Sequence, residues 1–216
     1  MANKIYDEIK NRIAEYPQGE VFFTSDFRDI ATLTTIRKCL GRQVEEGTIR
    51  RIMDGMYEKP IYSKVINEYI PPNPEKVAYG IARKYHWTIS PCGDVALNKL
   101  GISTQVPAVW TYISDGPYRD FGWENIKISF NHKKNREISF MSEISIIVIE
   151  AIKTLGKDHI DDKMSFVIIE VNFTNLNSDD LKCPFVIAFD NMLNKVDYDI
   201  NNFLINNFKV ISFKYN

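Results

Sequence analysis

The side chains best suited to binding chemistry lie between residues 34 and 51. This stretch holds five basic and two acidic residues, although the whole 216-residue chain has a net charge of -1. Arg, Lys and Thr side chains can hold phosphates or read base edges in the major groove of DNA. A local excess of positive charge matters at contact distance, so an overall charge near zero does not exclude DNA as a ligand. The candidate DNA-binding residues are Thr34, Thr35, Arg37, Lys38, Arg42, Arg50 and Arg51.

A helix and a hairpin are expected to position these residues. Aliphatic residues recur at helical spacing from residue 33, which predicts an amphipathic helix with Leu33, Ile36, Leu40 and Val44 inward. On that helix Thr35, Lys38 and Arg42 face outward, and Arg37 lies on the flank. Gly47 is a natural helix end. Residues 48–52 and 56–58 are predicted strands joined by a turn at 53–55, with Arg50 and Arg51 on opposite sides of one strand.

The elements before this stretch complete a recognisable order. We expect a helix over residues 3–16, a short strand at 21–23 and a second helix over 25–31. Helix, strand, two helices and a basic hairpin are typical of a winged helix-turn-helix, which we assign to residues 1–62. A charged outer helix face is usually only a solvated surface, and winged helices also serve as protein-interaction modules. Both alternatives stay open at this point.

A second, larger domain is predicted to follow. Pro71, Pro72 and Pro74 stiffen the chain and mark a boundary within residues 60–73. We expect helices over 74–85, 94–100 and 142–155, and strands over 86–90, 109–114 and 125–131. The tail, residues 161–216, differs in composition and alternates like strands at 165–173, 185–189 and 210–213, with helical spacing over 190–208. The predicted fold class is therefore α+β, with a winged helix followed by a mixed α+β domain at 73–216.

The remaining candidate sites are weak. His86, His132 and His159 are scattered without ligands at metal spacing, so no metal or cofactor is predicted. Cys92 precedes a predicted helix, where a thiol can be activated, but a buried space-filling role is favoured. A cluster of aromatic and basic residues is more typical of a sheet face with a solvated loop than of a site for single-stranded nucleic acid. The aromatic residues are Trp110, Tyr112, Tyr118, Phe121 and Trp123, and the basic residues are Arg119, Lys133, Lys134 and Arg136. Asn98 and Lys99 suit a structural or a partner-binding role equally.

Several function classes are disfavoured by what the sequence lacks. The motifs GxSxG, HExxH, GxGxxG and the P-loop are missing, so we predict that the protein is not an enzyme. The N-terminal residues lack the apolar run of a signal peptide, and the apolar runs are too short to span a membrane. The three cysteines are far apart and suit a reducing compartment. We therefore expect a cytoplasmic protein.

Three segments resemble AbiE-type (type IV toxin–antitoxin) antitoxins and a related uncharacterised bacterial family. They are IYDEIKNRIAEYPQGEVFFTSDF, RKCLGRQVEEGTIRRIMDGMYEKP and SPCGDVALNKLGISTQVP, within a similarity that covers residues 3–158. The resemblance implies a winged helix that represses its own operon, and an antitoxin that counters a nucleotidyltransferase-like toxin encoded beside it, without stable contact between the two proteins. It supplies no catalytic residue and does not cover residues 161–216.

These observations give one leading hypothesis and two others. The first is a DNA-binding autorepressor and antitoxin of an abortive-infection system, whose partner is duplex DNA at its own promoter, with repeated sites or dimerisation raising the affinity. The second is a protein-interaction module in which the winged helix is a scaffold. The third, an enzyme in the second domain, has no motif in its favour.

Overall fold

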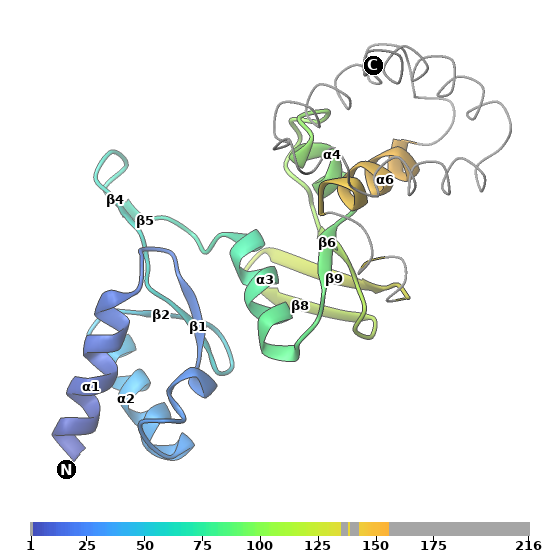
Figure 1. The fold of residues 1–216 in the computed structure, drawn as a ribbon. Helices are drawn as coiled ribbons and strands as arrows, with labels where there is room; N and C mark the ends of the chain where they lie inside the picture. The colour runs from blue at the N-terminus through green and yellow to red at the C-terminus, as the bar shows by residue number, and fades with distance from the viewer. Residues whose placement is uncertain (1, 135–137, 139–142, 156–216) are drawn as a thin grey trace, which may run out of the picture. The chain divides into compact units, whose positions relative to one another are not determined.

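The computed structural model describes residues 2–134, 138 and 143–155 (Figure 1). The chain forms two compact units, each described here by itself. The first contains residues 1–87 and 120–128, and the second contains residues 88–119 and the chain from residue 129 on. The fold is mixed α+β, as predicted, with five α-helices in the described part. The predictions for residues 161–216 lie outside the described residues.

The first unit begins with a helix, a strand and a short turn of helix. These are α1 (Ala2–Glu15), β1 (Val21–Phe23) and the 3-10 helix η1 (Thr24–Phe27), followed by α2 (Leu33–Glu45). The hairpin of β2 (Arg50–Met53) and β3 (Met56–Glu58) comes next. The three strands form an antiparallel sheet in the order β1-β3-β2, with Phe22 opposite Tyr57.

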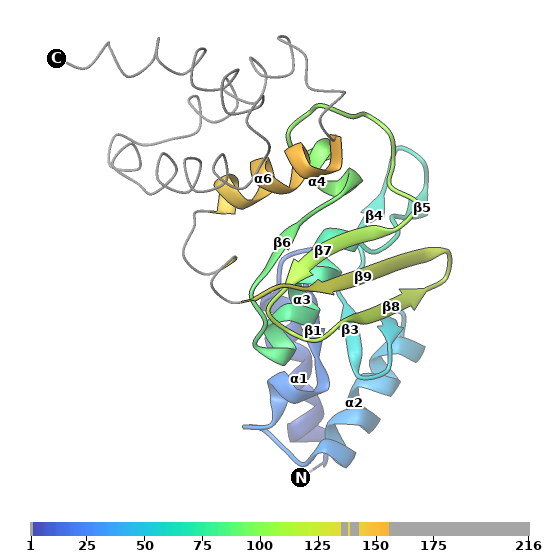
Figure 2. The same ribbon diagram turned by 90° about the vertical axis from the view of Figure 1, so that its right-hand side faces the viewer.

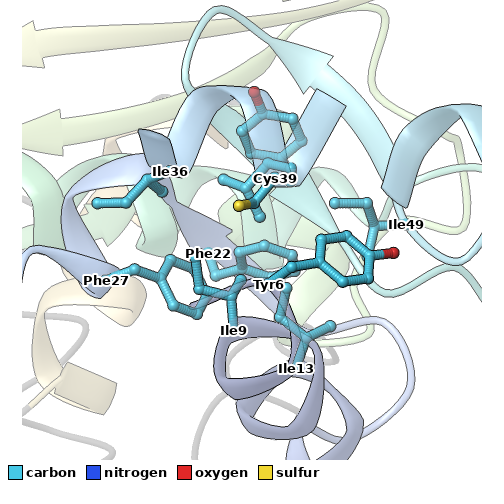
Figure 3. Close-up of a cluster of buried hydrophobic side chains, with 10 residues drawn as sticks. Tyr6, Ile9, Ile13, Phe22, Phe27, Ile36, Cys39 and Ile49 are labelled. Carbon is cyan, nitrogen blue, oxygen red and sulfur yellow. The ribbon is translucent and has the colours of Figure 1, made fainter. Parts of the chain in front are cut away.

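A single hydrophobic cluster joins these elements (Figure 3). Ile9 of α1, Phe27 of η1, and Ile36 and Leu40 of α2 are fully buried in it. The buried face of α2 is rotated from the predicted one, since Cys39 and Gln43 are buried and Leu33 and Val44 are only half-buried. The helix packs against α1 and η1 at once, and these contacts enclose the side of α2 that carries Cys39 and Gln43.

The predicted helix over residues 25–31 is wrong in kind and length. The segment makes only the short turn η1, in which the Asp26 carboxylate accepts the backbone N–H of Phe23 at 2.9 Å. Single turns follow, in which the backbone N–H groups of Arg28 and Ile30 donate to the carbonyls of Ser25 and Phe27. Phe27 is buried in the core, and residues 28–30 form turns instead of continuing the helix.

The segment after β3 forms a hairpin and then a helix. β4 (Tyr62–Ser63) and β5 (Glu68–Tyr69) pair antiparallel, and this hairpin was not predicted from the sequence. Helix α3 (Pro74–Tyr85) starts as predicted, with the Asn73 side chain accepting the backbone N–H groups of residues 75 and 76. By its contacts α3 belongs to the first unit; where the functional domains divide stays a prediction.

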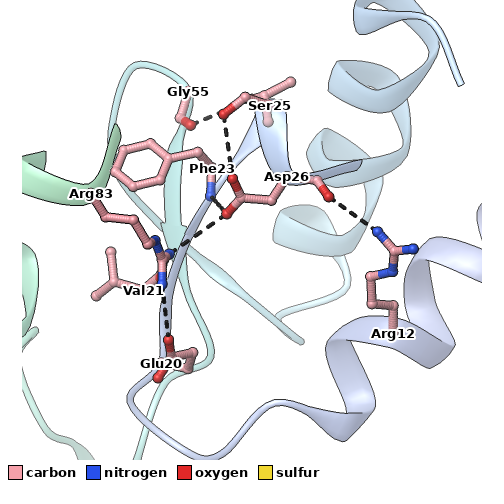
Figure 4. A network of polar contacts seen from close by, with 9 residues as sticks. Arg12, Glu20, Val21, Phe23, Ser25, Asp26, Gly55 and Arg83 are labelled. Atoms are coloured by element: carbon pink, nitrogen blue, oxygen red, sulfur yellow. Dashed lines mark hydrogen bonds and ion pairs between the residues drawn. The ribbon is translucent and has the colours of Figure 1, made fainter. Parts of the chain in front are cut away.

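Arg83 of α3 joins that helix to β1 and η1 (Figure 4). Its guanidinium donates to the backbone carbonyl of Val21 at 2.8 Å and lies 3.7 Å from carboxylate oxygens of Glu20 and Asp26. A Cβ on Gly80 would meet Val21 at 3.0 Å, which shows how closely α3 approaches β1. The glycine thus permits a close helix–strand contact.

A second set of elements follows α3. It comprises β6 (Ile89–Pro91), α4 (Asp94–Lys99), β7 (Trp110–Ser114), β8 (Arg119–Trp123), β9 (Ile126–His132) and α6 (Glu143–Leu155), and the strand order in the sheet is β6-β7-β9-β8 (Figure 2). Helices α4 and α6 pack on each other and against β6. Strand β8 was not predicted, because its sequence RDFGW does not alternate. In β9, Ile128 and Phe130 are buried on one face, as predicted.

Candidate nucleic-acid interface

The exposed face of α2 carries four of the predicted residues. Thr34, Arg37, Lys38 and Arg42 are exposed, whereas Thr35 is half-buried and its hydroxyl lies 3.1 Å from that of Thr32. The burial of Ile36 and Leu40 on the opposite side fixes this orientation. The helix therefore presents hydroxyl and basic groups to solvent in its first two turns.

The basic residues of α2 differ in whether they form ion pairs within the protein. Arg42 pairs with Glu46 at 3.1 Å, and its guanidinium lies 4.4 Å from the centre of the Tyr6 ring. Arg37 and Lys38, in contrast, make no ion pair with any residue that the structure describes. Among the described residues, an anionic ligand would therefore have no ion pair to break at these two side chains.

Glu46 holds the C-terminal end of α2 against α1. Its carboxylate accepts the Tyr6 hydroxyl at 2.6 Å and the Lys10 ammonium at 3.3 Å. The hydrogen bond from Tyr6 lowers the pKa of Glu46, and Lys10 and Arg42 lower it further against partial desolvation. Burial raises the pKa of Tyr6, and the bond to Glu46 adds to that rise. Arg42 is thus part of a structural network that the helical pattern did not reveal.

The two arginines of β2 lie in different surroundings. Arg51 is 54% exposed and pairs with Asp54 of the turn at 2.6 Å. Arg50 is 25% exposed and lies 3.4 Å from the buried carboxylate of Glu58. Burial raises the pKa of Glu58; Arg50 and Lys76 oppose that rise and Glu124 adds to it. The prediction placed these arginines on opposite sides of the strand, and the exposed one is Arg51.

A groove of about 340 Å³ runs between α2 and the β2–β3 hairpin. Two arginines line it, Arg37 from the helix and Arg51 from the hairpin, together with the acidic residues Glu45 and Asp54. Gly41 opens the helix side, since a Cβ there would meet no atom within 4 Å. The groove thus brings together two predicted residues that lie fourteen positions apart in the chain.

Several of the other candidates have structural roles or lie outside the described residues. Cys92 is 6% exposed and burial raises the pKa of its thiol, which opposes a nucleophilic role. Tyr112 and Trp123 are buried, so neither offers a face for stacking bases. His132 lies 2.8 Å from the backbone carbonyl of Gly116, and His159 and Arg136 lie outside the described residues. No group of three metal-ligating side chains gathers in the part of the chain that the structure describes.

The motif around Asn98 has a local explanation. The Asn98 amide donates to the backbone carbonyls of Asp94 and Gln105, at 3.1 and 2.6 Å. It therefore ties α4 to the loop after it, and the Ser103 hydroxyl accepts the Gln105 N–H within that loop. This contact favours the structural role for Asn98. Lys99 makes contacts of its own and is not assigned.

A family model described as "Family of unknown function (DUF6088)" matches residues 8–177, which is most of the chain. No curated protein matches the sequence. Within the described residues, no helix is both long enough and apolar enough to cross a membrane.

Proposed function

The chain belongs to the DUF6088 family of proteins of unknown function, and from the geometry of its first unit we propose that residues 1–62 form a winged helix that binds double-stranded DNA. The observation that carries this proposal is the pair Arg37 and Lys38, exposed on α2 beside a groove whose other wall holds Arg51. In the proposed complex α2 enters the major groove, and the β2–β3 turn lies along the adjacent backbone.

Three features support this assignment over a merely solvated surface. Arg37 and Lys38 are without acidic partners in the described part of the chain, so no ion pair there already neutralises their charges. Thr34 lies exposed beside them and adds a hydroxyl suited to phosphate or base contacts. The groove between helix and hairpin places a second arginine on the same side.

The proposed contact set is Thr34, Arg37, Lys38 and Arg51, which are exposed on the helix or on the hairpin beside the groove. Arg51 reaches a phosphate when DNA displaces its bond to Asp54. Arg50 lies beside the buried Glu58, so its proposed role is to neutralise that carboxylate. Arg42 contributes only if DNA displaces its bond to Glu46.

The biological role that we propose is autorepression by a cytoplasmic antitoxin, and for this the support is the sequence resemblance alone. In that role the protein binds repeats upstream of its own gene and counters a nucleotidyltransferase-like toxin encoded beside it. A toxin gene of that class next to this one, whose toxicity is relieved by this protein, is the expected finding. An unrelated neighbour would remove the antitoxin role without affecting the proposed DNA contact.

DNA binding is tested with the full chain and the duplex upstream of its own gene. Fluorescence anisotropy at several salt concentrations should show tighter binding to this duplex than to a shuffled one. Three phosphate contacts, from Arg37, Lys38 and Arg51, predict a slope of log K against log salt of about -2.7 for one chain. Binding that is absent, or that does not respond to salt, would favour the protein-interaction module instead.

A further inference from the structure

An exposed apolar arm extends from the first unit. It is the hairpin of residues 61–70, built on β4 and β5, and Figure 1 shows it extending away from α1, α2 and the first sheet. Six large hydrophobic residues are exposed in these ten positions: Ile61, Tyr62, Val65, Ile66, Tyr69 and Ile70. The rest of the described chain exposes only three. Such a density of exposed apolar side chains is typical of an interaction site.

The arm has a defined root and an ordered interior. Lys59, just before it, donates to the backbone carbonyls of Ala14 and Tyr16 at the end of α1, both at 2.7 Å. Within the arm, the rings of Tyr62 and Tyr69 lie 5.1 Å apart, edge to face, and the Tyr62 hydroxyl donates to Asn67. A preorganised surface loses little conformational entropy when it docks. The exposure of the arm is therefore a feature of a fixed element and not of a loose loop.

We propose that this arm binds the arm of a second copy of the same chain. The six residues are between 37% and 94% exposed, which amounts to roughly 600 Å² if a whole side chain exposes on the order of 150–200 Å². Complete coverage by a second copy would bury at most about 1,200 Å² in total, the lower end of the range for a stable protein interface. The arm by itself therefore suits a weak dimer.

The charges of the arm fit a copy of itself better than a partner of one sign. Lys64 and Glu68 are exposed and make no ion pair with the described residues, so the arm carries one positive and one negative group. In a two-fold interface the same patch meets itself, and each contact occurs twice. Lys64 of one copy can then face Glu68 of the other, in both halves of the interface.

This inference rests on the proposed function, because a dimer would carry two DNA-binding surfaces. Two linked surfaces bind two half-sites with a higher affinity than one surface binds one. The arm would thus supply the dimerisation that a short contact set needs. It names the partner as a second copy of this chain.

Self-association is measured first without DNA, by sedimentation equilibrium of the full chain. We expect a monomer–dimer equilibrium in the micromolar range. Val65→Asp places a charge at the most exposed apolar residue and should raise the dimer dissociation constant by at least about 100-fold. Val106→Asp is the matched control, since Val106 is also strongly exposed but lies outside the arm, and it should leave the equilibrium unchanged.

A charge exchange tests the two-fold geometry. Lys64→Glu and Glu68→Lys should each weaken the dimer by about tenfold, and the double variant should restore it. A wild-type chain that stays monomeric, a dimer insensitive to Val65→Asp, or a double variant as weak as the single ones would each overturn the proposal. Because Val65→Asp should still bind a single half-site, loss of dimerisation and loss of DNA binding are separate results.

Discussion

Removal of Arg37 and Lys38 is the most direct test of the proposed contact. The double variant Arg37→Ala/Lys38→Ala deletes two exposed cations that have no acidic partner among the described residues. Each phosphate contact releases about 0.9 counterion, so the salt slope should become shallower by about 1.8. If the variant and the wild type bind equally at 1 M salt, this change in slope corresponds to roughly a 60-fold lower affinity of the variant at about 0.1 M salt.

The fold should not change in this variant, because neither side chain is part of the core. We expect the free energy of unfolding to stay within about 0.5 kcal/mol of the wild type, measured by urea denaturation. The matched control is Lys4→Ala/Lys127→Ala, which removes the same charge from two exposed residues outside α2 and the β2–β3 hairpin. An equal loss of affinity in the control, or none in the test variant, would refute the assignment of the contact to α2.

Three further predictions concern stability. Because the pKa of Glu46 is lowered in the folded state, its bond to Tyr6 stabilises the fold above the ordinary carboxyl pKa, and this stabilisation is lost as the pH falls through the folded pKa. Tyr6→Phe should therefore reduce the loss of stability in acid, measured by urea unfolding across pH. The raised pKa of Glu58 has the opposite sign: the wild type should lose stability as the pH rises from about 4.3 through the folded value, and Glu58→Gln should remove that slope. If both pH profiles match that of the wild type, the carboxyl environments described here are wrong. Asn73→Ala removes the two capping bonds of α3 and should cost about 1 kcal/mol in urea unfolding, whereas an unchanged midpoint would show that the cap contributes nothing.

Periodicity predicted the elements whose signals are local. The helical spacing of Leu33, Ile36, Leu40 and Val44 predicted α2, and Asn73 followed by Pro74 predicted the start of α3. The prediction was wrong over residues 25–31, where the chain makes only the short turn η1 followed by single turns. It did not find β8 or the β4–β5 arm, since short strands depend on pairing partners that a linear pattern does not contain.

The sequence and the tertiary structure also determined different features of the candidate site. The sequence by itself determined which residue types gather between positions 34 and 51, and that their charge is locally positive. Only the tertiary structure decided which of these charges are free. Arg42 is drawn to Glu46 and the ring of Tyr6, a residue 36 positions away, and Arg50 to the buried Glu58. Ion pairs form between groups that folding brings together, so a charge count along the chain cannot reveal that Arg37 and Lys38 are without an acidic partner among the described residues.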